Sequence, residues 1–104
     1  MNQHERKPDA VTFRLPGDAY LLIKEAHLLS RSAKAAILLA VPQRFKEIEM
    51  SCSLDIAAEI LTWFNDYEKH AELMRQFRWE VPVCRRAAKR ISDALSQHMK
   101  RESS

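Results

Sequence analysis

Basic side chains gather near the C-terminal end of the chain, and arginine and lysine are residue types that bind phosphate. A guanidinium group can donate paired hydrogen bonds to phosphate oxygens or to the edge of a guanine base. Residues 75–101 hold eight basic and two acidic residues, a net charge of +6, whereas residues 1–74 hold nine basic and eleven acidic residues, net −2. A solvated helix face is the alternative interpretation. The pattern predicts a DNA-contacting surface made of Arg75, Arg78, Arg85, Arg86, Lys89 and Arg90.

A second pattern that could bind DNA lies near the N-terminus. Val11, Phe13 and Leu15 alternate with Thr12 and Arg14, a period of two that is typical of a short strand. This segment and the helix expected after it resemble the opening of ribbon-helix-helix repressors. In that family one strand from each subunit pairs with the other, and the outward polar residues read the major groove. The resemblance implies that Thr12 and Arg14 are the reading residues, and an extended arm is the alternative.

Residues that could support catalysis or hold a metal form no recognisable motif. Paired carboxylates occur at helical positions where they more often solubilise a protein than transfer protons. Cys52 and Cys84 are 32 residues apart and fit two free thiols in a reducing compartment, with one disulfide as the alternative. We therefore expect no enzyme activity, no metal and no cofactor. No metal-ligand spacing connects the four histidines, His4, His27, His70 and His98.

Composition excludes several classes of protein. The 104 residues include one glycine, so no glycine-rich phosphate loop can form, and a compact all-β fold with many tight turns is disfavoured. No apolar run approaches the roughly 18–20 residues of a membrane span. The first nine residues are polar and lack the apolar core of a secretory signal. We expect a cytoplasmic protein with no membrane association and no small-molecule substrate.

Helical spacing predicts an all-α domain over residues 11–100, with a short N-terminal strand or arm. Residues 1–10 are expected to be flexible, and residues 101–104 form a tail. Asp18 is expected to cap a helix, continuing to about residue 40 as one helix or as two helices broken near residues 30–32. A further helix is expected over residues 42–50, beginning at a proline.

Two longer helices are expected in the second half of the chain. Ser51 or Ser53 would cap a helix of roughly 24 residues whose large apolar side chains follow one stripe and must pack on another helix or another chain. Val81-Pro82 would end it, because the residue before proline is disfavoured in the α region. A basic helix would then cover about residues 83–100.

A set of short tracts from Tyr20 onward covers about 60 residues in all. They are Tyr20-Leu21-Leu22, Ala33 and Ala35, Leu39-Ala40-Val41, Phe45, residues 52–61 and Phe77-Arg78-Trp79-Glu80. With these tracts the chain resembles the FlhD family, which includes the flagellar master activator subunit and FlhD-like activators of conjugative elements such as SetD and AcaD. Ala40 replaces the glycine of the family pattern, and the family's cysteine before the Phe-Arg element is missing.

The resemblance implies an all-helical homodimer that joins an FlhC-like partner subunit, binds promoter DNA and recruits RNA polymerase to activate transcription. Any zinc would belong to the partner. The expected residues of the core and dimer interface are Tyr20, Leu21, Leu22, Ile37, Leu54, Ile60, Phe64 and Tyr67.

Two other hypotheses remain open. One is a ribbon-helix-helix regulator that reads DNA through Thr12 and Arg14. The other is a small helical antiactivator that does not bind DNA and docks its aromatic stripe on a transcription regulator. These three hypotheses differ in which surface is used and in whether DNA is bound at all.

Overall fold

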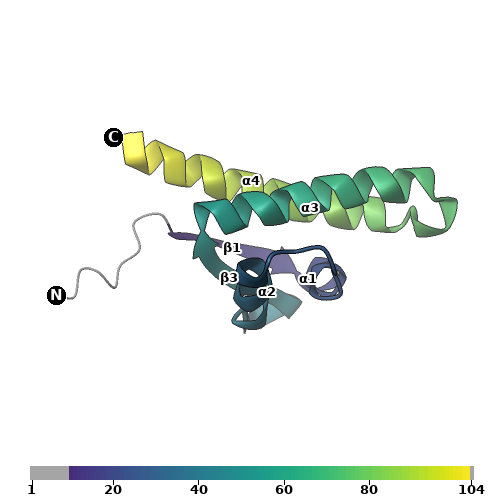
Figure 1. Ribbon diagram of the computed structural model, residues 1–104, viewed down its shortest axis with the longest axis horizontal. Coiled ribbons are helices and arrows are strands. Elements are labelled where there is room, and N and C mark those ends of the chain that lie inside the picture. Colours follow the sequence, from purple (N-terminus) through teal and green to yellow (C-terminus); the bar gives the residue numbers. More distant parts are fainter. Residues whose placement is uncertain (1–9, 104) are drawn as a thin grey trace.

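The protein is an α+β domain in which three antiparallel strands pack against helices (Figure 1). The structure is a computed structural model that describes residues 10–103, apart from the side chains of Gln76 and of residues 101–103. The expectation of an all-α fold is therefore wrong. The elements in chain order are β1 (Ala10–Pro16), α1 (Gly17–Lys24), α2 (Arg31–Leu38), β2 (Val41–Pro42), β3 (Glu47–Ser53), α3 (Leu54–Leu73) and α4 (Glu80–Ser103), with short 3-10 turns at Arg44–Lys46 and Arg75–Phe77.

The strand predicted from alternation at residues 11–15 is confirmed as β1. The sheet order is β1-β3-β2, and Phe13 lies opposite Met50 in the antiparallel β1–β3 register. Because side chains alternate between the two faces of a strand, Val11, Phe13 and Leu15 are all buried, whereas Thr12 and Arg14 are exposed. The sheet thus has one apolar face against the helices and one polar face.

The helix predicted over residues 42–50 is wrong, because this segment forms β2, a tight turn and most of β3. Ile48, Met50 and Cys52 stand two residues apart, which is the period of a strand with one buried face. Met50 and Cys52 are buried on the apolar face of the sheet. β3 pairs with β2 at two residues and with β1 along its whole length, and the pairing with β1, more than thirty residues away in the chain, decides the local structure.

The long helices α3 and α4 form an antiparallel hairpin that covers the apolar face of the sheet (Figure 1). Ser53 caps α3 as predicted, since its Oγ accepts a hydrogen bond of 3.3 Å from the backbone N–H of Ile56. The chain turns between Leu73 and Glu80, so the break predicted at residues 81–82 is wrong. Pro82 instead lies in the first turn of α4, where its missing N–H has no partner to lose.

The start of α1 also differs from the prediction. Asp18 is not the N-cap but lies within the first turn, where its Oδ1 accepts a hydrogen bond of 2.8 Å from the N–H of Ala19. The first two helices are separate, with the break at residues 25–30. The expected flexible segment lies outside the described residues except for Ala10, which begins β1, and residues 101–103 of the expected tail continue α4.

The core of the single chain contains most of the residues expected there. Ile37, Ile60 and Phe64 are buried. Leu21 is an exception, because its side chain is largely exposed and contributes nothing to the core. Four of the expected residues are partly buried and pack against the core, namely Tyr20, Leu22, Leu54 and Tyr67. In the described part of the chain, no helix is long and apolar enough to cross a membrane.

We predict that Phe64→Ala lowers the free energy of unfolding by about 3–5 kcal/mol, because the ring is fully buried and its loss leaves a cavity. Urea denaturation measures the change. The matched variant Leu38→Ala, which removes an exposed side chain, should stay within about 0.5 kcal/mol of the unmodified protein. Equal losses in the two variants would contradict this placement of the core.

Candidate nucleic-acid interface

The first half of the domain contains two short helices, α1 and α2, joined by six residues and followed by a β-hairpin; this pair follows the chain order of a helix-turn-helix, and we call it by that name. Residues 25–30 connect α1 to α2, and the hydroxyl of Tyr20 on α1 donates a hydrogen bond of 2.7 Å to the carbonyl of Ile37 on α2. The hairpin of β2 and β3 follows directly after α2. In helix-turn-helix proteins the second helix enters the major groove of DNA. α2 has that position here, and the turn at Arg44–Lys46, which we call the wing, lies next to it in the chain.

Contacts from α3 fix the N-terminus of α2. The Ser30 side chain caps α2 by accepting a hydrogen bond of 3.1 Å from the N–H of Ala33. The Glu59 carboxylate on α3 accepts two hydrogen bonds from Ser30, of 2.7 Å from the backbone N–H and 2.8 Å from the hydroxyl. A carboxylate at this place also complements the positive end of the helix dipole. The N-terminus of α2 is therefore tied to α3.

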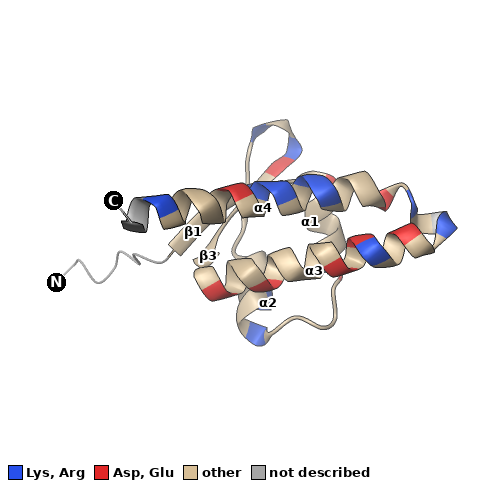
Figure 2. Cartoon of the chain, turned by 90° about the horizontal axis from the view of Figure 1, so that it is seen from above, with Lys and Arg blue, Asp and Glu red and all other residues tan. Residues whose placement is uncertain are grey.

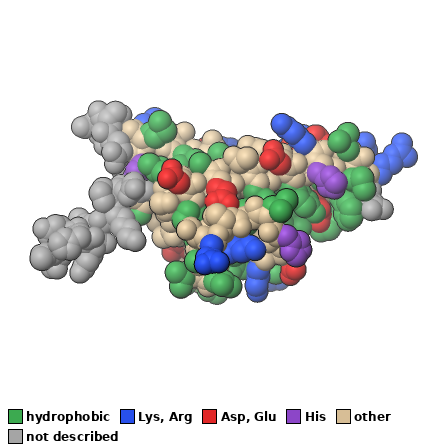
Figure 3. All heavy atoms as spheres, in the orientation of Figure 1, with side chains coloured by type: hydrophobic (Ala, Val, Ile, Leu, Met, Phe, Trp, Pro, Cys, Tyr) green, Lys and Arg blue, Asp and Glu red, His purple; other side chains and the backbone are tan. Residues whose placement is uncertain are grey.

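The outer face of α2 carries free basic side chains. Ala33, Ala36 and Ile37 are buried, which leaves Arg31 and Lys34 on the exposed side, three residues apart and therefore adjacent. Neither forms an ion pair or side-chain hydrogen bond with any residue that the structure describes. Figure 3 shows blue side chains gathered over this lower part of the molecule.

The wing presents two further basic residues around an exposed aromatic ring. Phe45 is 92% exposed, and Phe45 and Lys46 have φ angles of 60° and 58°, a left-handed backbone that costs side-chain-bearing residues energy. The N–H of Gln43 closes the turn by donating a hydrogen bond of 2.6 Å to the carbonyl of Glu47. Arg44 and Lys46 are exposed and, within residues 10–103, form no ion pair.

The single glycine of the chain brings the wing close to the start of α1. A Cβ atom on Gly17 would lie 2.7 Å from the backbone carbonyl oxygen of Lys46, a distance that real Cβ atoms essentially never show. Any other residue at this position would push the wing away. Arg86 of α4 lines the hollow between the wing and α1, about 660 Å³ in volume, so one of the predicted DNA-binding residues lies beside the wing.

Most of the basic side chains predicted to bind DNA on α4 are engaged within the chain. Arg85 lies 2.7 Å from Glu68 and 3.2 Å from Glu72 of α3, and the hydrogen bond that its Nε donates to the Glu68 carboxylate raises the pKa of the guanidinium group further. Lys89 lies 3.0 Å from Asp93 one turn along α4. Figure 2 shows α3 and α4 side by side, with acidic segments on α3 near basic segments on α4. The charge of +6 is thus partly offset by acidic residues from elsewhere in the sequence.

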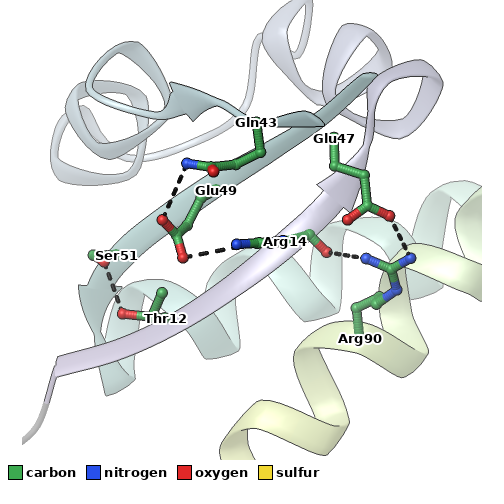
Figure 4. Close-up of polar contacts among 7 residues, drawn as sticks. All are labelled: Thr12, Arg14, Gln43, Glu47, Glu49, Ser51 and Arg90. Carbon is green, nitrogen blue, oxygen red and sulfur yellow. Dashed lines mark hydrogen bonds and ion pairs between the residues drawn. The ribbon is translucent and has the colours of Figure 1, made fainter. Parts of the chain in front are cut away.

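The Arg90 side chain is also engaged within the chain, where it joins α4 to the sheet (Figure 4). Its guanidinium group donates hydrogen bonds of 2.7 Å to the Glu47 carboxylate and 3.0 Å to the backbone carbonyl of Arg14. The bond from Arg90 holds the pKa of Glu47 below its ordinary value. Arg90 therefore ties α4 to both β1 and β3. Of the remaining predicted residues, Arg75 and Arg78 are exposed at the connection between α3 and α4, away from the helix-turn-helix.

Thr12 and Arg14 lie on the polar face of the sheet, as Figure 4 shows. The Thr12 Oγ1 is 2.8 Å from the Ser51 Oγ, and the Arg14 Nε is 3.9 Å from a Glu49 carboxylate oxygen. One edge of β1 is paired to β3 of the same chain. The other edge pairs with no strand in the described part of the chain.

Sequence reasoning missed the basic cluster of α2 and the wing. Residues 31–46 contain four basic residues and no acidic residue. That local excess was present in the sequence, but the net charge of −2 over residues 1–74 concealed it. The four residues, which we call the helix-wing cations, are Arg31, Lys34, Arg44 and Lys46.

Neither cysteine is placed for chemistry. Both thiols are free and buried, and burial raises the pKa of Cys52 to about 11 and, together with the Glu80 carboxylate, that of Cys84 to about 12. The thiolate, which is the reactive form, is therefore scarce near neutral pH. No group of three or more histidine, cysteine or acidic side chains within the described residues is arranged to hold a metal ion.

We predict that Ser30→Ala lowers the free energy of unfolding by about 1 kcal/mol, because it removes the cap of α2. The hydroxyl contact with Glu59 is lost as well. Amide hydrogen exchange should become faster in α2 than in α3. The control variant Ser32→Ala, at the exposed second residue of the same helix, should leave exchange in α2 unchanged, and an equal effect of both variants would argue against the capping role.

We further predict that neither thiol of the native protein reacts with a thiol reagent near neutral pH, whereas both react after unfolding. Because the folded pKa values of Cys52 and Cys84 lie above their ordinary value of 9.0, the neutral thiols favour the folded state below that pH. This contribution should fade as the pH rises from about 9 to about 12. Stopped-flow thiol titration and pH-dependent denaturation measure the two effects, and rapid labelling of the folded chain would contradict them.

Comparisons with known proteins do not assign the chain to a family. Searches against protein-family models, curated proteins and solved structures find no match. The resemblance to the FlhD family therefore stays a prediction, and the function is argued from the geometry of the helix-turn-helix and the wing.

Proposed function

We propose that this protein binds double-stranded DNA as a transcription regulator, with α2 in the major groove and the wing against the neighbouring backbone. Arg31 and Lys34 would contact phosphates or base edges, because both project from the exposed face of α2. Arg44 and Lys46 would bind phosphate oxygens from the wing. Regulation of transcription and a cytoplasmic location are parts of the same proposal.

The observation that carries this proposal is the contrast between two sets of basic residues. The helix-wing cations are exposed and without an ion pair among the described residues. Arg85, Lys89 and Arg90 on α4 each have a carboxylate within 3.0 Å. A cation that already pairs with a carboxylate must give up that contact to bind phosphate, whereas a free cation only releases water and counterions. The four free cations of α2 and the wing therefore favour this surface over α4, where Arg86 is the one predicted residue without an ion pair among the described residues.

Other parts of the earlier expectations remain separate predictions. A homodimer that works with an FlhC-like partner and RNA polymerase to activate transcription is what the FlhD resemblance implies, although its all-helical fold is wrong for this chain. The ribbon hypothesis requires Thr12 and Arg14 to leave Ser51 and Glu49 or to bind DNA beside them. The antiactivator hypothesis requires no DNA at all.

The test is a binding experiment on duplexes enriched by the unmodified protein from a random pool. We expect enrichment, and binding measured by fluorescence anisotropy should weaken as salt rises. A plot of log affinity against log salt concentration has a negative slope. The Arg31→Ala/Lys34→Ala variant should make this slope shallower by about two, because each lost phosphate contact removes roughly one released counterion.

The matched control is Arg85→Ala/Lys89→Ala, which removes the same charge from α4. It should leave the salt slope unchanged, and circular dichroism should show both variants folded. Absence of any enriched duplex, or an unchanged slope for Arg31→Ala/Lys34→Ala, would overturn the proposal. If only the α4 variant lost DNA affinity, the C-terminal helix would be the contact surface. If only Arg14→Ala lost DNA affinity, the ribbon hypothesis would be favoured.

A further inference from the structure

We infer that two copies of this chain associate reciprocally, with the connection between α3 and α4 of each copy seated in an acidic apolar groove of the other. The inference concerns surfaces outside the helix-wing cations, and it does not depend on DNA binding. Both surfaces expose apolar side chains in the single chain, and their charges are opposite, acidic on the groove and basic on the connection.

The groove lies between α3 and the segment that joins α1 to α2, and its volume is about 870 Å³. Leu21, Leu28 and Trp63 line it, and Leu28 is 93% exposed in the single chain. The Trp63 ring stacks on Tyr67, with ring centroids 5.0 Å apart, so the aromatic wall of the groove is preorganised. Large exposed apolar side chains gathered around a hollow mark a binding surface.

Acidic side chains surround this apolar floor. Glu25, Asp55, Glu59 and Asp66 all line the groove, and neither lysine nor arginine does. Figure 3 looks onto this face, where acidic side chains follow α3. Glu59 is already bonded to Ser30. Glu25, Asp55 and Asp66 form no ion pair within residues 10–103 and remain available to a partner. The groove therefore suits a segment that is both apolar and basic.

Such a segment is present on the same chain, at residues 73–79, which we call the hairpin tip. Leu73 is 83% exposed and Trp79 is 62% exposed. Between them, Arg75 and Arg78 are exposed and have no ion pair in the described part of the chain. Tryptophan and arginine are the residue types most enriched where interfaces hold most of their binding energy. The tip therefore combines apolar side chains with the basic charge that the groove does not contain.

A second copy is the occupant that satisfies both surfaces at once. The residues of α3 that line the groove, from Asp55 to Tyr67, recur at helical spacing on one side of the helix, and Leu73 continues that side toward the tip. A two-fold axis that crosses α3 between the groove and the tip sets the two α3 helices antiparallel. Each tip then lies in the groove of the other copy. Such an isologous contact closes on itself and leaves no free copy of either surface.

Charge reversal on each surface tests this arrangement. We expect the unmodified chain to have twice its 12.1 kDa mass by analytical ultracentrifugation. The tip variant Arg75→Glu/Arg78→Glu and the groove variant Glu25→Arg/Asp66→Arg should each be monomeric, because like charges then face each other. The two variants mixed together should form a heterodimer, since both of its contacts are again complementary.

A chain that carries all four substitutions should also return to a dimer, which distinguishes lost contacts from a failure to fold. The control Arg86→Glu/Lys89→Glu makes the same change of charge on α4, outside both surfaces, and should remain dimeric. A monomeric unmodified chain, dimers that persist in both reversed variants, or a mixture that stays monomeric would each overturn the inference. None of these results depends on DNA, so they are independent of the binding experiment above.

Discussion

The packing of α4 against the apolar face of the sheet is the contact on which the rest of the structure depends. The sheet is close to a two-stranded hairpin, because β2 has only two residues, and such a hairpin is marginally stable unless its apolar face is buried. α4 meets that face with small and medium side chains, Ala87 and Ile91 among them, and both are completely buried. Small residues let the helix approach closely, so the inner residues of β1 and β3 lose their contact with water. Around this contact, α1 packs against α4 and the sheet, and α2 packs against α3 and β3.

This packing also explains why the C-terminal charges serve the fold. Once α4 lies on the sheet and beside α3, its basic side chains stand next to Glu47, Glu68 and Glu72. Individually, exposed ion pairs add little stability. Arg90 differs because it joins three elements, through the Glu47 carboxylate and the Arg14 carbonyl. These contacts join α4 to the sheet and to α3, whereas the basic residues without an ion pair in the described part of the chain include those of α2, the wing and the hairpin tip.

Part of the fold was readable from the sequence, and the rest required knowledge of long-range contacts. Alternation at residues 11–15 identified β1, and Ser53 was one of two proposed caps for α3. β3 alternates equally well, but its short apolar run also fits a helix, and only pairing with β1 decides between them. Val81-Pro82 predicts the end of a helix, but proline is also favoured in a first turn, and Pro82 lies in the first turn of α4. The candidate site was missed because charge was summed over long segments, whereas α2 and the wing concentrate it within residues 31–46.

The proposed dimer contact and the proposed DNA-binding surface are compatible in their geometry. α3 has 20 residues, and a helix of that length spans about 30 Å. α2 is tied to the N-terminal half of α3 through Ser30 and Glu59. If two α3 helices lie antiparallel, the two copies of α2 stand near opposite ends of the pair, separated by a distance of the order of 30 Å. Successive major grooves on one side of DNA are about 34–36 Å apart. Reciprocal docking of the hairpin tip would therefore present two α2 helices at a spacing that suits a palindromic site, and the length of α3 would set that spacing.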